Sequence, residues 1–377
     1  MSSRATVRRC GTTVAFALAA LAAHGAEVSP ADAEARAVRL YDAGDYAGAR
    51  EILEGMYREG SLDGPSLYRL AFARGVAGDV QGKSQAEQQA VLALESAYAA
   101  GADLEVAFYL ANAYRNSGRS ADALRIASET TAAYDRGERP SPTDPLDRFR
   151  LGKLYEDQRR TDASARWYGL AVEAMDREPS NFVGYRRWAH RHLGDVAFAA
   201  DDFAGAMAHY AAVTGIPGAV PEDWDRQAVA AGRLGRWEEA GRAWRAAESA
   251  DPSRADRARY CRRLAGMAVA LGALPSALGD GRSFRDLSKE DLEGVLKDRA
   301  AVVESTLASI RPDETLTDEA RAQLQKVLDD AKPVFTAAGL EYALRGLPIR
   351  ETAFVGGYAP LIFQSSKWMV PEDAPAE

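Results

Sequence analysis

The stretch that decides the fold is LANAYRNSGRSADALRIA, residues 110–127. Small residues stand at Ala111 and Ala123, on either side of a turn at Gly118. A glycine at such a turn ends a helix because it adopts a positive φ without strain, and small side chains let two helices approach closely. The stretch therefore predicts a pair of short antiparallel helices.

The same pattern recurs along the chain. In each copy a helix ends at a turn, an aromatic or branched residue follows, and an alanine comes three residues later. The copies begin near residues 30, 64, 104, 145, 187 and 221, and the copy at 64 is degenerate. One helix pair cannot bury its apolar face alone. Pairs that repeat at such regular intervals along the chain are therefore expected to stack into an array.

These copies resemble the tetratricopeptide repeat (TPR) family over roughly residues 30 to 254, and the final copy, which ends at Asp251-Pro252, matches closely. The resemblance implies an all-α fold. We expect a right-handed TPR-like α-solenoid of about six helix pairs, which occupies residues 27–254.

The family resemblance also implies a binding surface. In proteins of this kind the first helix of each pair lines a concave groove that holds a protein or peptide partner. On that scheme the partner-groove residues are Phe108, Asn112, Arg115, Asn116, Phe149, Lys153, Arg191 and Arg233. Their charge suggests a groove for an extended, partly acidic peptide or a polyanionic chain; the alternative is a solvated inner face with incidental charges.

The first 26 residues predict a signal peptide. Arg4, Arg8 and Arg9 precede a short apolar run at residues 14–23, and small residues follow up to Ala26. The run is too short to span a bilayer, which needs about 20 residues, so we expect a cleaved signal, a periplasmic or otherwise exported protein, and no integral membrane segment after cleavage. An uncleaved anchor is the alternative.

The rest of the chain departs from the repeat pattern. Residues 255–285 predict an additional helix and a boundary loop, and residues 286–346 predict a helical region that caps the array. There Ser288 begins a helix with an acidic residue three positions later, as in a capping box. Residues 347–377 form an aromatic segment and tail, in which Gly356-Gly357 suggests a short β-hairpin, or else a short helix with an extended tail.

Chemistry-bearing patterns are scarce. His190 and His192 lie two residues apart and so point to different helix faces, which predicts no metal site. No catalytic or phosphate-binding motif occurs, so we expect no cofactor and no enzyme activity. The net charge of −8, without a basic block, argues against nucleic-acid binding.

Together these features predict a non-catalytic periplasmic scaffold or adaptor that binds a protein or peptide partner in envelope complex assembly or secretion. One alternative is a structural subunit of a larger envelope complex that docks through its C-terminal region. Another is an enzyme with a site in residues 286–370.

Overall fold

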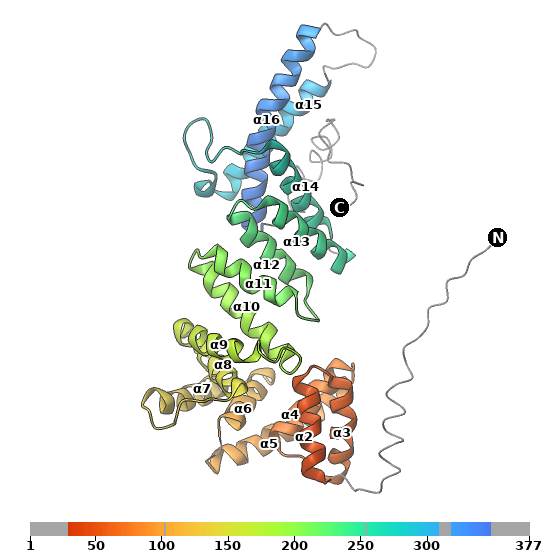
Figure 1. Cartoon of the computed structure of the whole chain (residues 1–377), viewed down its shortest axis with the longest axis vertical. Helices are drawn as coiled ribbons and strands as arrows, with labels where there is room; N and C mark the ends of the chain where they lie inside the picture. The colour runs from red at the N-terminus through yellow and green to blue at the C-terminus, as the bar shows by residue number, and fades with distance from the viewer. Residues whose placement is uncertain (1–28, 102, 253–254, 309–317, 348–377) are drawn as a thin grey trace, which may run out of the picture. The chain divides into compact units, whose positions relative to one another are not determined.

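The computed structural model describes residues 29–101, 103–252, 255–308 and 318–347 (Figure 1). In these ranges the chain is helical, and its only strand-like pairing is an isolated bridge between Ala277 and Ser283. The expected all-α fold is confirmed. The described chain divides into two compact units. The first runs to Arg160 and adds Arg177–Gly184, and the second holds Thr161–Asp176 and the rest from Tyr185.

The first unit is a series of helix pairs. Its helices are α2 (Pro30–Asp42), α3 (Tyr46–Glu59), α4 (Gly64–Val76), α5 (Val80–Ala99), α6 (Leu104–Asn116), α7 (Ser120–Asp135) and α8 (Pro145–Asp157). In the pairs α2–α3, α4–α5 and α6–α7 the two helices pack on one another, and the first helices α4, α6 and α8 also contact one another in sequence. Each first helix begins at the residue that the repeat spacing predicts.

Local sequence explains where these helices begin and end. Gly118 separates α6 from α7 with a φ of +77°, which is the left-handed conformation expected of that glycine. The aspartates that precede the first helices act as N-caps: Asp63 accepts from the Ser66 backbone N–H at 2.7 Å, and Asp103 accepts from that of Val106 at 3.1 Å. Turns and caps within each copy thus set where the two helices of a pair begin and end.

The second unit continues the helix pairs and adds the C-terminal helices. Its elements are α9 (Thr161–Met175), α10 (Val183–Ala199), α11 (Phe203–Thr214), α12 (Pro221–Arg233), α13 (Trp237–Ala250), α14 (Ala255–Leu271), the 3₁₀ helix η2 (Phe284–Asp286), α15 (Lys289–Ala308) and α16 (Asp318–Leu344). Helix α10 starts about one turn before the expected residue 187, since it also includes residues 183–186.

The C-terminal helices share one core with the last repeats. Helix α16 packs against both α12 and α14, and Trp244, Leu264, Phe335 and Tyr342 belong to a single buried cluster. The boundary stretch after α14 is a loop leading into η2, with no second repeat helix. Ser288 caps α15 by accepting from the Asp291 N–H at 3.0 Å. The described part of the chain holds no helix long and apolar enough to cross a membrane.

The signal peptide predicted over residues 1–26 and the hairpin predicted at Gly356-Gly357 lie outside the described residues.

Close helix approach depends on individual small residues. A Cβ atom on Gly194 would lie 2.6 Å from the ring of Tyr210, which is buried and donates a hydrogen bond to Asp195 at 2.8 Å. That ring is therefore held on both sides and cannot move aside. Gly169, on α9, offers a contrast, since a Cβ atom there would meet nothing within 4 Å.

We expect Gly194→Ala to destabilise the protein. Overpacking typically costs about 1–3 kcal/mol, while alanine returns about 1 kcal/mol of helix propensity, so the net loss is up to about 2 kcal/mol. Gly169→Ala is the matched control, because it gains the propensity without the clash and should stabilise by roughly 0.5–1 kcal/mol. Urea unfolding of both variants measures the difference; equal effects at the two sites would contradict the close packing.

A candidate partner-binding face

The candidate site is the surface shared by the first helices α4, α6 and α8, called here the first-helix face. Aromatic rings join these helices: the ring centroids of Tyr68 and Tyr109 are 5.1 Å apart, and those of Phe108 and Phe149 are 6.2 Å apart. Phe108 and Phe149, two of the predicted groove residues, are buried in this contact. They therefore pack α6 against α8 and present little surface to a partner.

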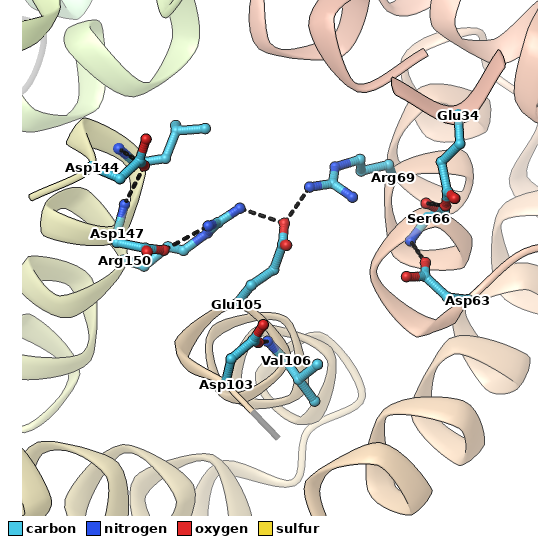
Figure 2. A network of polar contacts seen from close by, with 11 residues as sticks. Glu34, Asp63, Ser66, Arg69, Asp103, Glu105, Val106, Asp144, Asp147 and Arg150 are labelled. Carbon is cyan, nitrogen blue, oxygen red and sulfur yellow. Dashed lines mark hydrogen bonds and ion pairs between the residues drawn. The ribbon is translucent and has the colours of Figure 1, made fainter. Parts of the chain in front are cut away.

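A shared carboxylate ties the amino-terminal halves of the three helices together. Glu105 of α6 accepts hydrogen bonds from Arg69 of α4 and from Arg150 of α8, and Figure 2 shows the two guanidinium groups reaching toward it from opposite sides. Both arginines are buried, and Arg150 also donates to Asp147 at 2.7 Å. Buried cations of this kind need carboxylate partners, so Glu105 is a structural centre of the face.

The Tyr109 ring completes this centre. Its centroid lies 4.9 Å from Cζ of Arg69 and 5.9 Å from Cζ of Arg150, so each guanidinium also has an aromatic neighbour. The N-cap aspartates Asp63, Asp103 and Asp144 stand at the starts of the same three helices (Figure 2). The amino-terminal end of the first-helix face is therefore filled by internal charge pairs.

The predicted groove cations of the first unit are also paired within the fold. Arg115 donates to Asn112 at 2.8 Å and forms an ion pair with Asp157. Lys153 donates to Asp157 at 2.8 Å and lies 3.3 Å from a carboxylate oxygen of Glu156. The Lys153 side chain is only 12% exposed and that of Arg115 is 37% exposed. The positive strip expected from the sequence is thus largely neutralised by neighbouring acids.

The two amides of α6 differ in surroundings. The Asn112 side chain is buried, and its oxygen accepts a hydrogen bond from Arg115. Asn116, in contrast, is exposed and donates to the hydroxyl of Tyr68 at 3.1 Å. Burial raises the pKa of Tyr68 to about 12, so this hydroxyl keeps its proton. Asn116 is therefore the amide that a partner can reach.

The last two predicted groove residues lie in the second unit and hold it together. Arg191 makes a two-pronged contact of 2.7 Å and 2.7 Å with Asp223, which is fully buried. Arg233 of α12 donates to Glu341 of α16 at 2.8 Å, and Glu341 also accepts from Arg345 at 2.9 Å. Both arginines thus serve internal ion pairs.

Sequence reasoning missed two exposed apolar residues of α4, one of the three helices that form the first-helix face. Phe72 and Val76 of α4 are 41% and 59% exposed. The Phe72 ring lies at the edge of an aromatic cluster, 5.7 Å from that of Tyr41 and 5.1 Å from that of Tyr46. Their spacing of four residues on a first helix places them on one helix face and was a usable signal.

A serine and a histidine meet in the second unit without forming a nucleophile pair. Ser164 Oγ lies 2.8 Å from His192 Nε2, but its hydroxyl also donates to the carbonyl of Thr161 at 2.9 Å. A hydroxyl has one proton to donate, so in this arrangement it accepts from His192. Because Ser164 is fully buried, a substrate has no access to it.

Comparison with known proteins finds likeness at the level of structure alone. No protein-family model matches the sequence, and no curated protein matches it. The C-terminal part of a TPR repeat-containing protein from Cytophaga hutchinsonii is 17% identical, with 65% of this chain and 92% of that chain covered and a TM-score of 0.31.

Two further solved structures are similar. A tetratricopeptide repeat protein from Parabacteroides merdae is 16% identical over 62% of this chain and 97% of that chain, with a TM-score of 0.30. BtubC (BKLC) from P. vanneervenii is 15% identical over 63% and 94%, with a TM-score of 0.34.

We expect Glu105→Ala to destabilise the first unit by about 2–4 kcal/mol, because the buried guanidinium groups of Arg69 and Arg150 then lose the carboxylate that they share. Glu105→Gln keeps an acceptor and should lose less. Glu138→Ala, which removes an exposed pair with Arg136, is the control and should leave the urea midpoint essentially unchanged. The measurement is urea unfolding; similar losses for Glu105→Ala and Glu138→Ala would contradict the structural role of Glu105.

Proposed function

We propose that this protein is a non-catalytic scaffold that binds a protein partner through the first-helix face of its first unit. The observation that carries the proposal is the pair of exposed apolar side chains, Phe72 and Val76, on a face whose other large residues are packed or paired. Exposed apolar residues grouped on one surface mark interaction sites more often than scattered ones do.

The internal ion pairs point to the chemistry of that partner. An acidic peptide or a polyanion would have to compete with Asp157 for Arg115 and with Asp157 and Glu156 for Lys153. An apolar side chain faces no such competition at Phe72 and Val76. We therefore favour a partner segment that places an apolar side chain on these two residues and a polar backbone group near the exposed Asn116 amide.

Tyr68 connects the two parts of this surface. It lies one helical turn before Phe72 on α4, and its hydroxyl holds the Asn116 side chain. The apolar residues of α4 and the amide of α6 are thereby joined through one half-buried aromatic residue. Hot spots of protein interfaces commonly combine an apolar anchor with a nearby polar group in this manner.

The cellular setting is part of the proposal. The basic start, the short apolar run and the small residues up to Ala26 support export to the periplasm, where such a scaffold would serve envelope complex assembly or secretion. N-terminal sequencing of the protein from the envelope fraction is expected to begin just after residue 26. Recovery of the intact N-terminus would overturn the cleaved-signal proposal and favour an anchor.

A second candidate is a structural subunit that docks through the C-terminal region. It is favoured by Val302 of α15 and Val327 of α16, which are exposed on a helical hairpin. Deletion of residues 286–377 does not separate the two candidates cleanly. Helix α16 packs on α12 and α14, and its Leu344 side chain lies so close to Gly232 of α12 that a Cβ atom there would be only 2.6 Å from it. The deletion would therefore expose this core.

Site-specific photocrosslinking separates the candidates with the full chain. A photoreactive residue at Val76 is expected to capture a partner from the envelope fraction. The control position is Val80, which is 76% exposed but begins the second helix α5, and it should not capture that partner. Capture from Val327 and not from Val76 would overturn the first-helix face in favour of C-terminal docking.

Substitutions then measure the contribution of the face. Phe72→Ser with Val76→Ser should weaken binding of the captured partner by at least about tenfold, since burial of one such side chain is worth about 1.5–3 kcal/mol and tenfold corresponds to about 1.4 kcal/mol. Arg115→Glu should leave the same partner bound. Loss of binding in Arg115→Glu alone would restore the acidic-peptide hypothesis.

A further inference from the structure

Two histidines from neighbouring helices meet in the second unit. His190 of α10 and His209 of α11 face one another with their Nδ1 atoms 3.1 Å apart. The two rings have centroids 5.4 Å apart and are inclined by 43°. His190 is buried, and His209 is partly exposed. Sequence reasoning compared His190 with His192 on the same helix and so missed this pair, because the partner of His190 comes from the next helix.

A carboxylate orients the buried member of the pair. Nε2 of His190 lies 3.5 Å and 3.4 Å from the two carboxylate oxygens of Asp176, which Arg186 also contacts at 2.8 Å. A neutral imidazole has one N–H, and the carboxylate attracts it to Nε2. The lone pair of His190 then resides on Nδ1, where it faces His209.

Both imidazoles are suited to remain neutral. Burial lowers the pKa of His190 against the opposing effect of Asp176, and burial lowers the pKa of His209, with a further contribution from His190. The charged groups that act on the pair are Asp176, Arg186 and Asp202. Neutral imidazole nitrogen is the form that coordinates a metal ion.

The nitrogen separation matches that of two ligands on one metal ion. At a metal–nitrogen distance of about 2.0–2.1 Å, two neighbouring ligand atoms are roughly 2.9 Å apart at a right angle and roughly 3.4 Å apart at a tetrahedral angle. The observed 3.1 Å lies between these values. To bind an ion, His209 takes the tautomer with its proton on Nε2, which frees its Nδ1. The ion then lies to one side of the line between the two Nδ1 atoms, because two bonds of this length add up to more than 3.1 Å.

We propose that His190 and His209 form a binding site for a divalent transition metal ion, of which Cu²⁺ is the best match, with Asp176 as the outer group that orients His190. Imidazole ligands favour Cu²⁺, Ni²⁺ and Zn²⁺ over Mg²⁺ and Ca²⁺, and Cu²⁺ binds most strongly in this series. A carboxylate that holds the far nitrogen of a ligating histidine is a common feature of metal sites.

Water completes the coordination. Among the described residues no group of three or more histidine, cysteine or acidic side chains converges on one point. The two histidines thus supply two ligands, and the exposed side of His209 lets water take the other positions. A bound ion would link α10 to α11 directly and, through Asp176, to the segment that follows α9.

The site is tested by copper titration of the full chain purified without a polyhistidine tag. We expect one Cu²⁺ per chain with an electron paramagnetic resonance spectrum that shows coupling to two nitrogen atoms. His209→Asn should lower the affinity at least tenfold and remove the two-nitrogen coupling. Asp176→Asn should lower it roughly tenfold while both nitrogens remain, as expected of an outer group.

His192→Asn is the matched control, because it removes a histidine two residues away on the same helix that faces Ser164. It should leave the copper affinity and the spectrum unchanged, with circular dichroism to confirm that each variant is folded. Binding should also weaken as the pH falls, because protons compete for the same nitrogens. Equal affinity of the original chain and His209→Asn, or a spectrum with coupling to one nitrogen, would overturn the site.

Discussion

A short helix pair cannot bury its own apolar face, and this constraint governs the architecture of the protein. Each pair must lean on its neighbours, so the first helices α4, α6 and α8 come into contact with one another as well as with their own partners. Close approach then depends on small residues such as Gly194, whose missing Cβ leaves room for the ring of Tyr210. The same stacking brings polar side chains from successive copies into one another's reach.

Those polar side chains must find partners once they leave water. Arg69 and Arg150 are buried, and both bind Glu105, while Arg115 and Lys153 bind Asp157. A buried unpaired cation would cost several kcal/mol, so the acids are part of the fold. As a result the cationic residues of the first-helix face are committed to internal contacts, and its exposed apolar residues are the ones left for a partner.

The C-terminal helices end the stack by the same rules. The last repeat is followed by α14, which packs on α13, and α16 then packs on both α12 and α14. Glu341 supplies the carboxylate that Arg233 requires, and Arg345 donates to the backbone carbonyls of Phe284, Arg285 and Leu287. The cap is thus joined to the array by both apolar and charged contacts.

The sequence by itself determined the features that depend on neighbours in the chain. Turn glycines such as Gly118, the N-cap at Ser288 and the starts of the first helices other than α10 could be predicted, because caps and turns act over a few residues. The predicted groove residues also fall on first helices, since helical periodicity fixes the face on which a residue lies.

Only the tertiary structure decided which residues meet. Arg233 and Glu341 lie 108 positions apart, and His190 and His209 belong to different helices. The exposure of Phe72 and the pairing of Arg115 with Asp157 likewise depend on which acids and rings the neighbouring copies present. Periodicity tells which face of a helix a side chain occupies, but its partner is set by how the helices pack, and packing depends on contacts between residues far apart in the chain.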